Sequence, residues 1–292
     1  SVVNLDALKY SGNLENLADL AGHPQYTFVH ADIGDQKAVH ATLREHRIEG
    51  IINCAAETHV DRSILDPGAF ARTDVVGTGI LLEEARQAGD RLEPRSPYSA
   101  SKAGGDLLVL SYWTTYRFPV VVTRGSNTYG PNQYPEKFIP LFATNAIDGE
   151  PLPLYGDGRQ CRDWLSVYDH AAGIQHVFEQ GEPGTVYNVG GGNERENITV
   201  AEQIVATLGK SRSLIRFVQD RPGHDRRYSI DCRRLRALGW SPQVPFEEGL
   251  KQTVAWYRTH ESWWRTIKSG EFKDYYQQQY AKRLQQGTAC GL

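Results

Sequence analysis

Tyr98 and Lys102 are the residues whose types and spacing most directly suggest chemistry, since they stand four positions apart in the run YSASK. On a helix, residues i and i+4 share one face, which puts a phenol beside an ammonium group. The positive charge favours the phenolate and lowers the pKa of the tyrosine. Such a tyrosine could remove a hydroxyl proton while hydride leaves the same carbon, and the lysine could also hold a ribose. The spacing is common on protein surfaces, so its weight depends on the surrounding elements.

Polar and small residues also stand where short apolar runs end. Asp6 ends the first run, where a dinucleotide-binding fold puts the carboxylate that binds adenosine ribose hydroxyls. Asp32 and Ile33 end the second run and could touch an adenine, and Ala55 and Ala56 end the third and are small enough for close cofactor approach. A helix cap or simple packing is the alternative reading of each residue. The glycine-rich phosphate loop that normally precedes such a carboxylate is not in the sequence.

Basic and amide side chains suited to a phosphorylated ligand occur mainly in the second half of the chain. An arginine guanidinium can donate two parallel hydrogen bonds to phosphate oxygens. An asparagine side chain can hydrogen-bond to the hydroxyls and carbonyls of a sugar or base. The candidates are Asn127, Lys137, Arg162, Asn188, Asn197, Arg221, His224, Arg226 and Arg227. Exposed arginines and turn-forming asparagines often bind nothing, so these residues do not decide the function by themselves.

The elements that must position these residues alternate along the first half. Apolar runs typical of buried parallel strands are Val2–Asp6, Tyr26–His30, Gly50–Ala55 and Val120–Thr123. The helical patterns between them include Gln36–Arg47 and Val75–Gln87. This order predicts an α/β sheet with right-handed crossovers and a ligand crevice at the carboxyl ends of the strands.

The second half predicts a smaller α+β lobe. Its expected strands and helices are Thr185–Val189, Thr199–Leu208, Leu214–Val218 and Phe246–His260. One interval breaks the alternation: a helix ends at Gly89 and another begins near Pro97, which leaves no room for the expected strand. We expect a missing internal segment there, with a true helix–loop–helix as the alternative. The chain also opens inside a strand pattern and contains no Met, so we expect that its start is missing as well.

Composition excludes several classes of protein. The 292 residues are 40% hydrophobic, with a net charge of −3 and a pI near 6.3, which is typical of a globular chain. The numbers of acidic and basic residues are nearly balanced, so the sequence gives no electrostatic indication of binding to nucleic acid or to a membrane surface. No apolar run is long enough to span a bilayer. The four cysteines are widely separated, so neither a disulfide framework nor a metal site is indicated, and a reducing cytoplasm is expected.

Taken in order, these stretches resemble the extended short-chain dehydrogenase/reductase family, and most closely its dTDP-glucose 4,6-dehydratase branch. The runs that carry the resemblance are LDALKYSGNLENL (5–17), AAETHVDRSI (55–64), PRSPYSASKA (94–103), YGPNQYPEK (129–137), LYGDG (154–158), RDW (162–164) and DRPGHDRRY (220–228). The motif YxxxK indicates only the superfamily, whereas the second and last runs point to this branch.

The resemblance implies a Rossmann-type doubly wound parallel sheet over residues 1–127, to which 164–180 returns, and a nucleotide-sugar-binding α+β lobe over 128–292. It also implies a tightly held NAD and a dTDP-sugar substrate. Tyr98 would deprotonate the sugar 4-hydroxyl as hydride passes to NAD, water would leave across carbons 5 and 6, and hydride would return to carbon 6. A homodimer is expected, with helices 75–87 and 98–116 forming a four-helix bundle. The stripe Ala103, Leu107 and Leu110 suits that bundle and intramolecular packing equally.

Site residues carry over position by position from the resemblance. The residues implied for NAD are Asp6, Ala7, Leu8, Lys9, Asp32, Ile33, Ala55, Ala56, Thr73, Tyr98, Lys102 and Thr128. Those implied for the sugar nucleotide are His59, Asn127, Lys137, Phe138, Pro153, Tyr155, Arg162, Asn197, Asp220, Arg221 and His224.

The sequence also departs from the family pattern. Its glycine-rich loop GxxGxxG is absent, and so is the stretch between Gly89 and Pro94 that carries the Asp acid and Glu base of dehydration. Asp74 and Thr128 stand where the family usually has asparagine. Two alternatives therefore stay open: a nucleotide-sugar 4-epimerase or decarboxylase of the same fold, and an NAD-binding regulator without turnover.

Overall fold

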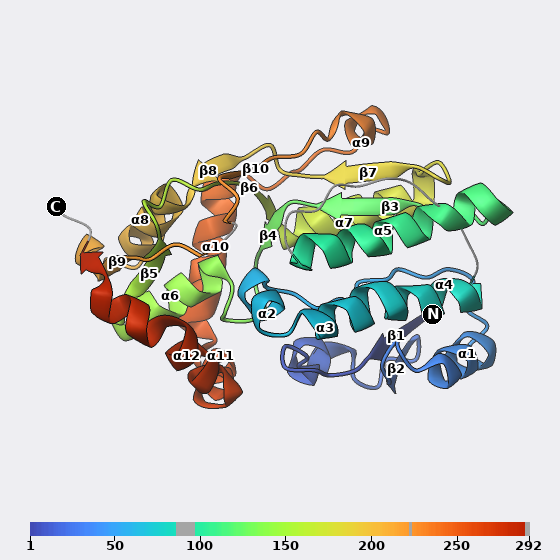
Figure 1. Cartoon of the computed structure of the whole chain (residues 1–292), viewed down its shortest axis with the longest axis horizontal. Coiled ribbons are helices and arrows are strands. Elements are labelled where there is room, and N and C mark those ends of the chain that lie inside the picture. Colours follow the sequence, from blue (N-terminus) through green and yellow to red (C-terminus); the bar gives the residue numbers. More distant parts are fainter. Residues whose placement is uncertain (86–96, 222–223, 290–292) are drawn as a thin grey trace. The chain divides into compact units, whose positions relative to one another are not determined.

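The computed structural model describes residues 1–85, 97–221 and 224–289. The chain divides into two compact units (Figure 1). Unit 1 comprises Ser1–Val122 with Glu182–Val186, and unit 2 comprises Thr123–Gly181 with Tyr187–Leu292. The short return to unit 1 is held by backbone hydrogen bonds from Gly184 to Val120 and from Val122 to Thr185. The predicted functional boundary at residue 127, with 164–180 returning to the first domain, stays a prediction.

Unit 1 is built from one parallel strand pair and a set of helices. Its elements are β1 (Val2–Asp6), the 3-10 helix η1 (Leu14–Leu20), β2 (Tyr26–His30), α1 (Gln36–Glu45), α2 (Val60–Leu65), α3 (Pro67–Phe70), the π-helix η2 (Ala71–Gly77), α4 (Thr78–Ala85) and α5 (Pro97–Tyr116). Strands β1 and β2 pair in register from Val2 opposite Tyr26 to Asp6 opposite His30. The residues that follow both strands therefore leave the sheet at the same edge.

Helix α5 packs against η2 and α4, and two glycines allow the close approach. A Cβ at Gly104 would lie 2.9 Å from a methyl of Val75, and one at Gly105 would lie 3.0 Å from the carbonyl oxygen of Asp74. Ala103 and Leu110 of the α5 stripe are buried within the single chain. The π-helical turn η2, a geometry frequent at functional sites, thus lies directly under the N-terminal half of α5.

The predicted strand at Gly50–Ala55 is wrong, because the structure has no strand there. Ile52 is 55% exposed, and the Asn53 side chain accepts the Ala55 N–H at 3.0 Å. A strand needs a ladder partner, and this local turn takes up the backbone donor instead.

Unit 2 contains the remaining elements of the chain. Its strands are β3 (Val122–Gly125, whose first residue belongs to unit 1), β4 (Asn127–Tyr129), β5 (Leu152–Tyr155), β6 (Cys161–Ser166), β7 (Val186–Val189, likewise), β8 (Glu194–Glu196), β9 (Ile215–Val218), β10 (Arg227–Tyr228) and β11 (Thr288–Ala289). Its helices are α6 (Phe138–Asp148), α7 (Val167–Gln180), α8 (Asn197–Thr207), the 3-10 helix η3 (Arg212–Leu214), α9 (Arg233–Ala237), α10 (Phe246–Thr259), α11 (Glu261–Ser269) and α12 (Glu271–Gln286).

The strands of unit 2 form mixed sheets over one aromatic core. Strand β6 lies parallel to β4 and β10 and antiparallel to β8, while β9 lies parallel to β5 and antiparallel to β11. Tyr129, Trp164 and Phe246 pack edge to face or tilted in the core, and Trp264 is fully buried beside them. This mixed arrangement confirms the α+β texture predicted for the second half. In the part of the chain that the structure describes, no helix has the length and apolar character needed to cross a membrane.

Candidate active site

The turn that follows β1 is shaped by Asp6. Its Oδ1 accepts the Leu8 N–H at 2.7 Å, and Leu8 takes a left-handed conformation with φ of 47°. The turn closes with a hydrogen bond from Gly12 to the Lys9 carbonyl at 2.8 Å. A Cβ at Gly12 would lie 2.6 Å from the Leu8 Cα, so only glycine fits there. The exposed Asp6 carboxylate is thereby fixed at the edge of the sheet, where a ribose could be bound.

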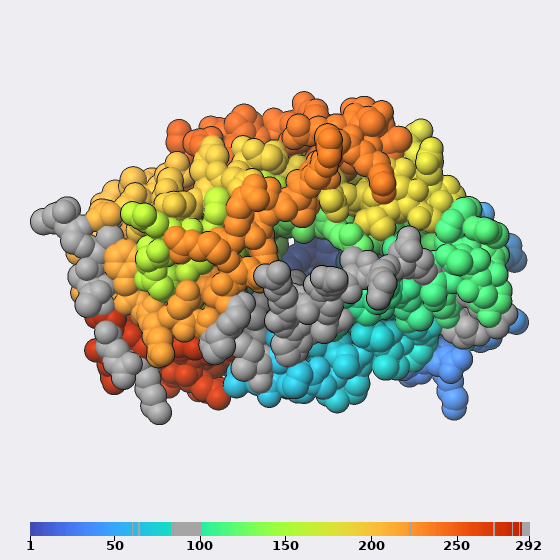
Figure 2. Space-filling model, turned by 45° about the horizontal axis from the view of Figure 1, so that its top comes forward, coloured from blue at the N-terminus to red at the C-terminus, as the bar shows by residue number. Residues whose placement is uncertain are grey.

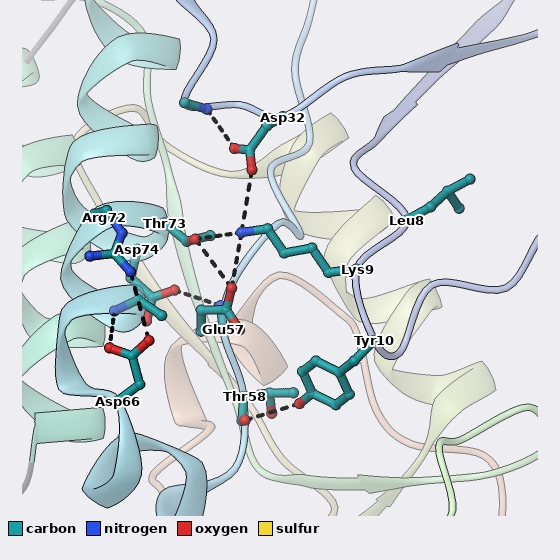
Figure 3. Close-up of polar contacts among 12 residues, drawn as sticks. Leu8, Lys9, Tyr10, Asp32, Glu57, Thr58, Asp66, Arg72, Thr73 and Asp74 are labelled. Atoms are coloured by element: carbon teal, nitrogen blue, oxygen red, sulfur yellow. Dashed lines mark hydrogen bonds and ion pairs between the residues drawn. The ribbon is translucent and has the colours of Figure 1, made fainter. Parts of the chain in front are cut away.

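Lys9 ties three segments of unit 1 together, as Figure 3 shows. Its ammonium donates to the Glu57 carboxylate and to the Thr73 hydroxyl, both at 3.0 Å, and lies 3.3 Å from Asp32. Burial disfavours the charged lysine, but the hydrogen bonds and charges of Glu57 and Asp32 prevail and raise its pKa. The pKa of Asp32 is lowered, chiefly by the Gly34 N–H and also by Lys9. This network sets the position of the two predicted cofactor residues Asp32 and Thr73.

Lys102 is the second cation of this site. It donates to the Glu57 carbonyl oxygen at 2.9 Å and lies 3.1 Å from the Asp74 carboxylate. Burial lowers its pKa, although the charge of Asp74 opposes that effect. Tyr98 belongs to the first turn of α5, one turn before Lys102, and its side chain lies outside the described residues.

The other predicted residues of unit 1 have less polar surroundings. Ile33 is buried, and Ala55 and Ala56 belong to the irregular segment before α2. His59, at the N-cap of α2, has a φ of 84° and lies 3.6 Å from Asp61. A non-glycine residue held in that region costs about 1–3 kcal/mol, and such strain clusters at functional sites.

In unit 2, Tyr155 at the end of β5 is the centre of a cationic and aromatic cluster. The Arg221 guanidinium lies 5.7 Å from its ring centroid, and the His224 ring meets it edge-on at 5.9 Å. His224 contacts the Asp220 carboxylate at 2.5 Å, yet burial and the charge of Arg221 lower its pKa. The Tyr155 hydroxyl accepts a hydrogen bond from Arg283 at 2.7 Å.

A second part of this cluster lies on β6 and at the start of α8. Arg162 is buried, donates to the Asp225 carbonyl at 2.9 Å and stacks 4.4 Å from the Tyr228 ring. Gln160 donates to Asp220 at 2.9 Å, while its own oxygen and the Asn197 oxygen are buried without a hydrogen-bond partner. Because such acceptors are costly to leave unpaired, this part of unit 2 favours a ligand or water that donates hydrogen bonds. In Figure 2 the orange atoms of the β9 region lie beside the yellow-green atoms of β5, with which β9 pairs.

The remaining predicted residues of unit 2 are more dispersed. Asn127 and Thr128 lie on β4, and the Thr128 hydroxyl contacts His170 at 2.6 Å. Lys137 lies 3.8 Å from Glu136 at the start of α6. The Phe138 ring stacks 4.2 Å from Phe142, and Pro153 is buried in β5. Phe138 thus packs against the core of unit 2 and Pro153 lies inside it, so contacts with the core cover much of the surface of both side chains.

Sequence reasoning did not assign several residues that the structure joins to these clusters. Glu57 and Ser101 lie inside the runs AAETHVDRSI and YSASK, so a spacing argument could have included them. Gln160 lies two residues before Arg162, just ahead of β6, and was equally accessible to that reasoning. Arg283 comes from α12, more than a hundred residues from Tyr155, and no local signal in the sequence connects the two.

Comparison with known proteins places the chain among nucleotide-sugar enzymes. A family model described as GDP-mannose 4,6 dehydratase matches residues 1–92 and 89–253. The dTDP-glucose 4,6-dehydratase of Xanthomonas campestris pv. campestris is 46% identical over 93% of this chain and 90% of its own length. The dTDP-glucose 4,6-dehydratase 1 of Escherichia coli K12 is 41% identical over 97% and 92%.

Solved structures agree with this placement. The crystal structure of dTDP-glucose 4,6-dehydratase from Bacillus anthracis in complex with NAD has a TM-score of 0.83 and 42% identity. The match covers 92% of this chain and 91% of the other. This likeness confirms the predicted α/β fold class of Rossmann type.

The comparisons also bear on the interval near Gly89. The Xanthomonas alignment extends over 316 positions, more than the 292 residues of this chain, so that relative has residues without a counterpart here. The two segments matched by the family model meet at residues 89–92, which supports the expectation of a missing internal segment. The predicted helix end at Gly89 itself lies outside the described residues. With a family model matching most of its length and relatives at 46% and 41% identity, the chain belongs to the GDP-mannose 4,6 dehydratase family and, within it, to the dTDP-glucose 4,6-dehydratases.

Proposed function

We propose that this protein is a lyase that converts dTDP-glucose into dTDP-4-keto-6-deoxyglucose with NAD as cofactor. The observation that carries the proposal is the 46% identity, over 93% of the chain, to a dTDP-glucose 4,6-dehydratase. Relatives at that level covering nearly the whole chain favour this reaction over epimerisation or decarboxylation by the same fold.

The residues of unit 1 fit an adenosine group. Asp6 offers an exposed carboxylate at the carboxyl end of β1, and Asp32 follows the neighbouring parallel strand. The small side chains of Ala55 and Ala56 would let the cofactor approach closely. Glu57, the next residue, positions Lys102 by accepting a hydrogen bond from its ammonium. NAD, when bound, accepts a hydride from the sugar and later returns it, so no external redox partner is required.

Tyr98 and Lys102 would perform the proton chemistry. The Lys102 ammonium would bind the ribose hydroxyls and, one helical turn from Tyr98, lower the pKa of the phenol. Tyr98 would then take the proton of the sugar 4-hydroxyl. The ketone formed at carbon 4 acidifies the carbon 5 proton, which makes elimination of water feasible. The acid and base of that elimination belong to the stretch that this sequence lacks.

The Tyr155 cluster of unit 2 would hold the nucleotide. Arg162 and Arg221 supply guanidinium groups for the diphosphate, and Tyr155 supplies a ring face for the base. The buried acceptor oxygens of Gln160 and Asn197 would receive hydrogen bonds from sugar or base donors. Lys137, Asn127 and His59 would complete the sugar contacts.

We further propose that the protein is a cytoplasmic homodimer. The helices η2, α4 and α5 would form the bundle between two copies, and Val76 of η2 supports this because it is an apolar side chain that is 56% exposed among the described residues.

The function is tested by incubating the full-length protein with dTDP-glucose and no added redox partner. Product is followed by its absorbance in alkali and by the loss of one water in mass spectrometry. Conversion should collapse in Tyr98→Phe and persist in Tyr116→Phe, a control at the exposed end of the same helix. A changed sugar stereochemistry or release of carbon dioxide, without loss of water, would instead establish an epimerase or decarboxylase. Binding of NAD without any turnover would establish the silent regulator.

A further inference from the structure

Asp74 is a buried carboxylate at the centre of unit 1 and has three donors around it. It is 4% exposed, and its Oδ1 accepts the Glu57 N–H at 2.8 Å. Its Oδ2 accepts the Ser101 hydroxyl at 2.6 Å and lies 3.1 Å from the Lys102 ammonium. Gly105 permits this arrangement, because a side chain there would press on the Asp74 backbone. Asp74 is thus a buried carboxylate whose two oxygens face hydrogen-bond donors and a cation, which is the arrangement of a paired buried charge.

An asparagine, the residue usual at this position in the family that the sequence resembles, could not make the same contacts. If its oxygen accepted the Glu57 N–H, its NH₂ group would face the Lys102 ammonium, and if its oxygen faced Lys102, its NH₂ group would face the Glu57 N–H. An asparagine would also leave the lysine without a countercharge at this distance. The aspartate therefore changes the electrostatics of this site rather than its shape.

The charges that act on Lys102 can be named element by element. Asp74 of η2 comes first, followed by Glu57 from the segment before α2 and Asp106 on α5 itself. The other charged side chains described on helices packed against α5 have contacts elsewhere: Asp61 with His59, Arg62 with the Tyr10 ring, Arg72 with Asp66 and Glu84 with His40. Burial lowers the pKa of Lys102, and Asp74 is the strongest opposing charge.

We propose that Asp74 is a positioning residue, which keeps the partly buried Lys102 ammonium protonated and directed for the reaction. The inference rests on the proposed function for what Lys102 does with substrate and cofactor, but the ion pair itself exists without either. Relative to an asparagine, Asp74 thus shifts upward the pH range in which the Lys102 ammonium stays charged.

The direct test measures the protonation of Lys102 without turnover. The protein is labelled with trace acetic anhydride across a pH series, and acetylation of each lysine is quantified by mass spectrometry. In Asp74→Asn the labelling midpoint of Lys102 should fall by about 1 pH unit or more, since an opposite charge at this distance has that effect. Ser101→Ala removes a hydrogen bond from the same carboxylate but no charge, so it should not lower the midpoint. Asp106→Asn should lower it less than Asp74→Asn does.

An unchanged or raised midpoint in Asp74→Asn, or an equal fall in Asp106→Asn, would overturn the proposal. Should Asp74→Asn fail to fold, Asp74→Ser, which is smaller and can still accept the Glu57 N–H, carries the same test. In turnover, the alkaline limb of the pH profile of kcat should move to lower pH in Asp74→Asn, whereas a loss of activity that is equal at every pH would show a merely structural role. Because labelling needs no substrate, a protein that fails to convert dTDP-glucose would leave the labelling result standing and would refute only the proposed function.

Discussion

Burial lowers the pKa of Lys102, and the charge of Asp74 opposes that effect. Its ammonium contacts the Glu57 carbonyl and the Asp74 carboxylate, which fix its direction, so it can bind a ribose without reorganising. The same rigidity means that its loss cannot be compensated by a neighbour, since Lys9 is held by Glu57, Thr73 and Asp32.

Lys102→Ala should therefore weaken NAD binding by about 10- to 100-fold, the effect of one or two hydrogen bonds from a charged donor. Fluorescence titration with NAD measures this change. Lys268→Ala, which removes another partly buried lysine paired with Asp148 in unit 2, is the matched control and should leave the affinity for NAD unchanged. Equal weakening in both variants would mean that general destabilisation, not contact, is responsible.

His224 would give the proposed nucleotide site a pH dependence with a definite sign. Burial and the charge of Arg221 lower its pKa below the usual value, so the free protein carries it neutral near pH 7. A bound diphosphate favours the protonated ring, so the affinity for dTDP should rise as pH falls from about 8 to about 5.5. Calorimetry measures the affinity for dTDP of the unchanged protein and of His224→Gln at each pH. The ratio of the two affinities removes the contribution of the nucleotide's own ionisation. A ratio that stays constant with pH would contradict this role.

Among the elements, strand β6 organises unit 2 through Asp163. Its buried carboxylate accepts the N–H groups of Gly191 and Asn193 at 3.0 and 2.7 Å, and so ties the glycine-rich turn after β7 to the strand. A Cβ at Gly191 would lie 2.3 Å from the Trp164 carbonyl oxygen, which shows how closely the turn approaches. The aspartate of the RDW run is thus structural, beside an arginine predicted to bind substrate.

Asp163→Ala should lower the free energy of unfolding by about 2–4 kcal/mol, because it leaves one buried and one partly buried backbone donor without their acceptor. Chemical denaturation monitored by tryptophan fluorescence measures the loss. Asp157→Ala is the comparison, since it removes an exposed ion pair with Arg226 and an exposed hydrogen bond from the Arg159 N–H, and should change stability little. Similar losses in the two variants would refute the structural role of Asp163.

Most elements were predictable from periodicity, and the exceptions have physical causes. Helices α1, α5, α8 and α10 and strands β1, β2, β7 and β9 lie within two residues of their predicted starts, because apolar spacing and caps such as Asp35 are local signals. The strand predicted at Gly50–Ala55 failed because a strand depends on a partner elsewhere in the chain, which no local pattern reveals. The π-helical form of η2 likewise could not be predicted from the local sequence, and η2 packs against α5, which is distant in the chain.

The candidate site was predictable only in part. The motif YSASK pointed to Lys102, and the ends of β1 and β2 pointed to Asp6 and Asp32. The Lys9 network and the Tyr155–Arg283 contact join segments far apart in the sequence, so they required the fold. Asp74 was noticed as a departure from the family pattern, but its pairing with Lys102 emerges only from the close approach of η2 and α5.

At the scale of the whole molecule, the proposed homodimer makes a prediction about mass and surface. Light scattering after size exclusion should give twice the chain mass of 32.7 kDa. Val76→Asp should give the monomer mass, because a charge would be buried in an apolar bundle. Phe178→Asp places the same change on an equally exposed residue of α7 and should leave the dimer intact. A dimer that survives Val76→Asp would place the interface elsewhere.

The measurement that tests the account most directly follows one hydrogen atom through the reaction. The full-length protein is incubated with dTDP-glucose carrying deuterium at carbon 4, and the product is examined by mass spectrometry and NMR. Oxidation, elimination and hydride return predict a 4-keto-6-deoxy product with the deuterium at carbon 6. Deuterium that remains at carbon 4 of an epimerised sugar, or that is lost to solvent, would contradict the proposed reaction.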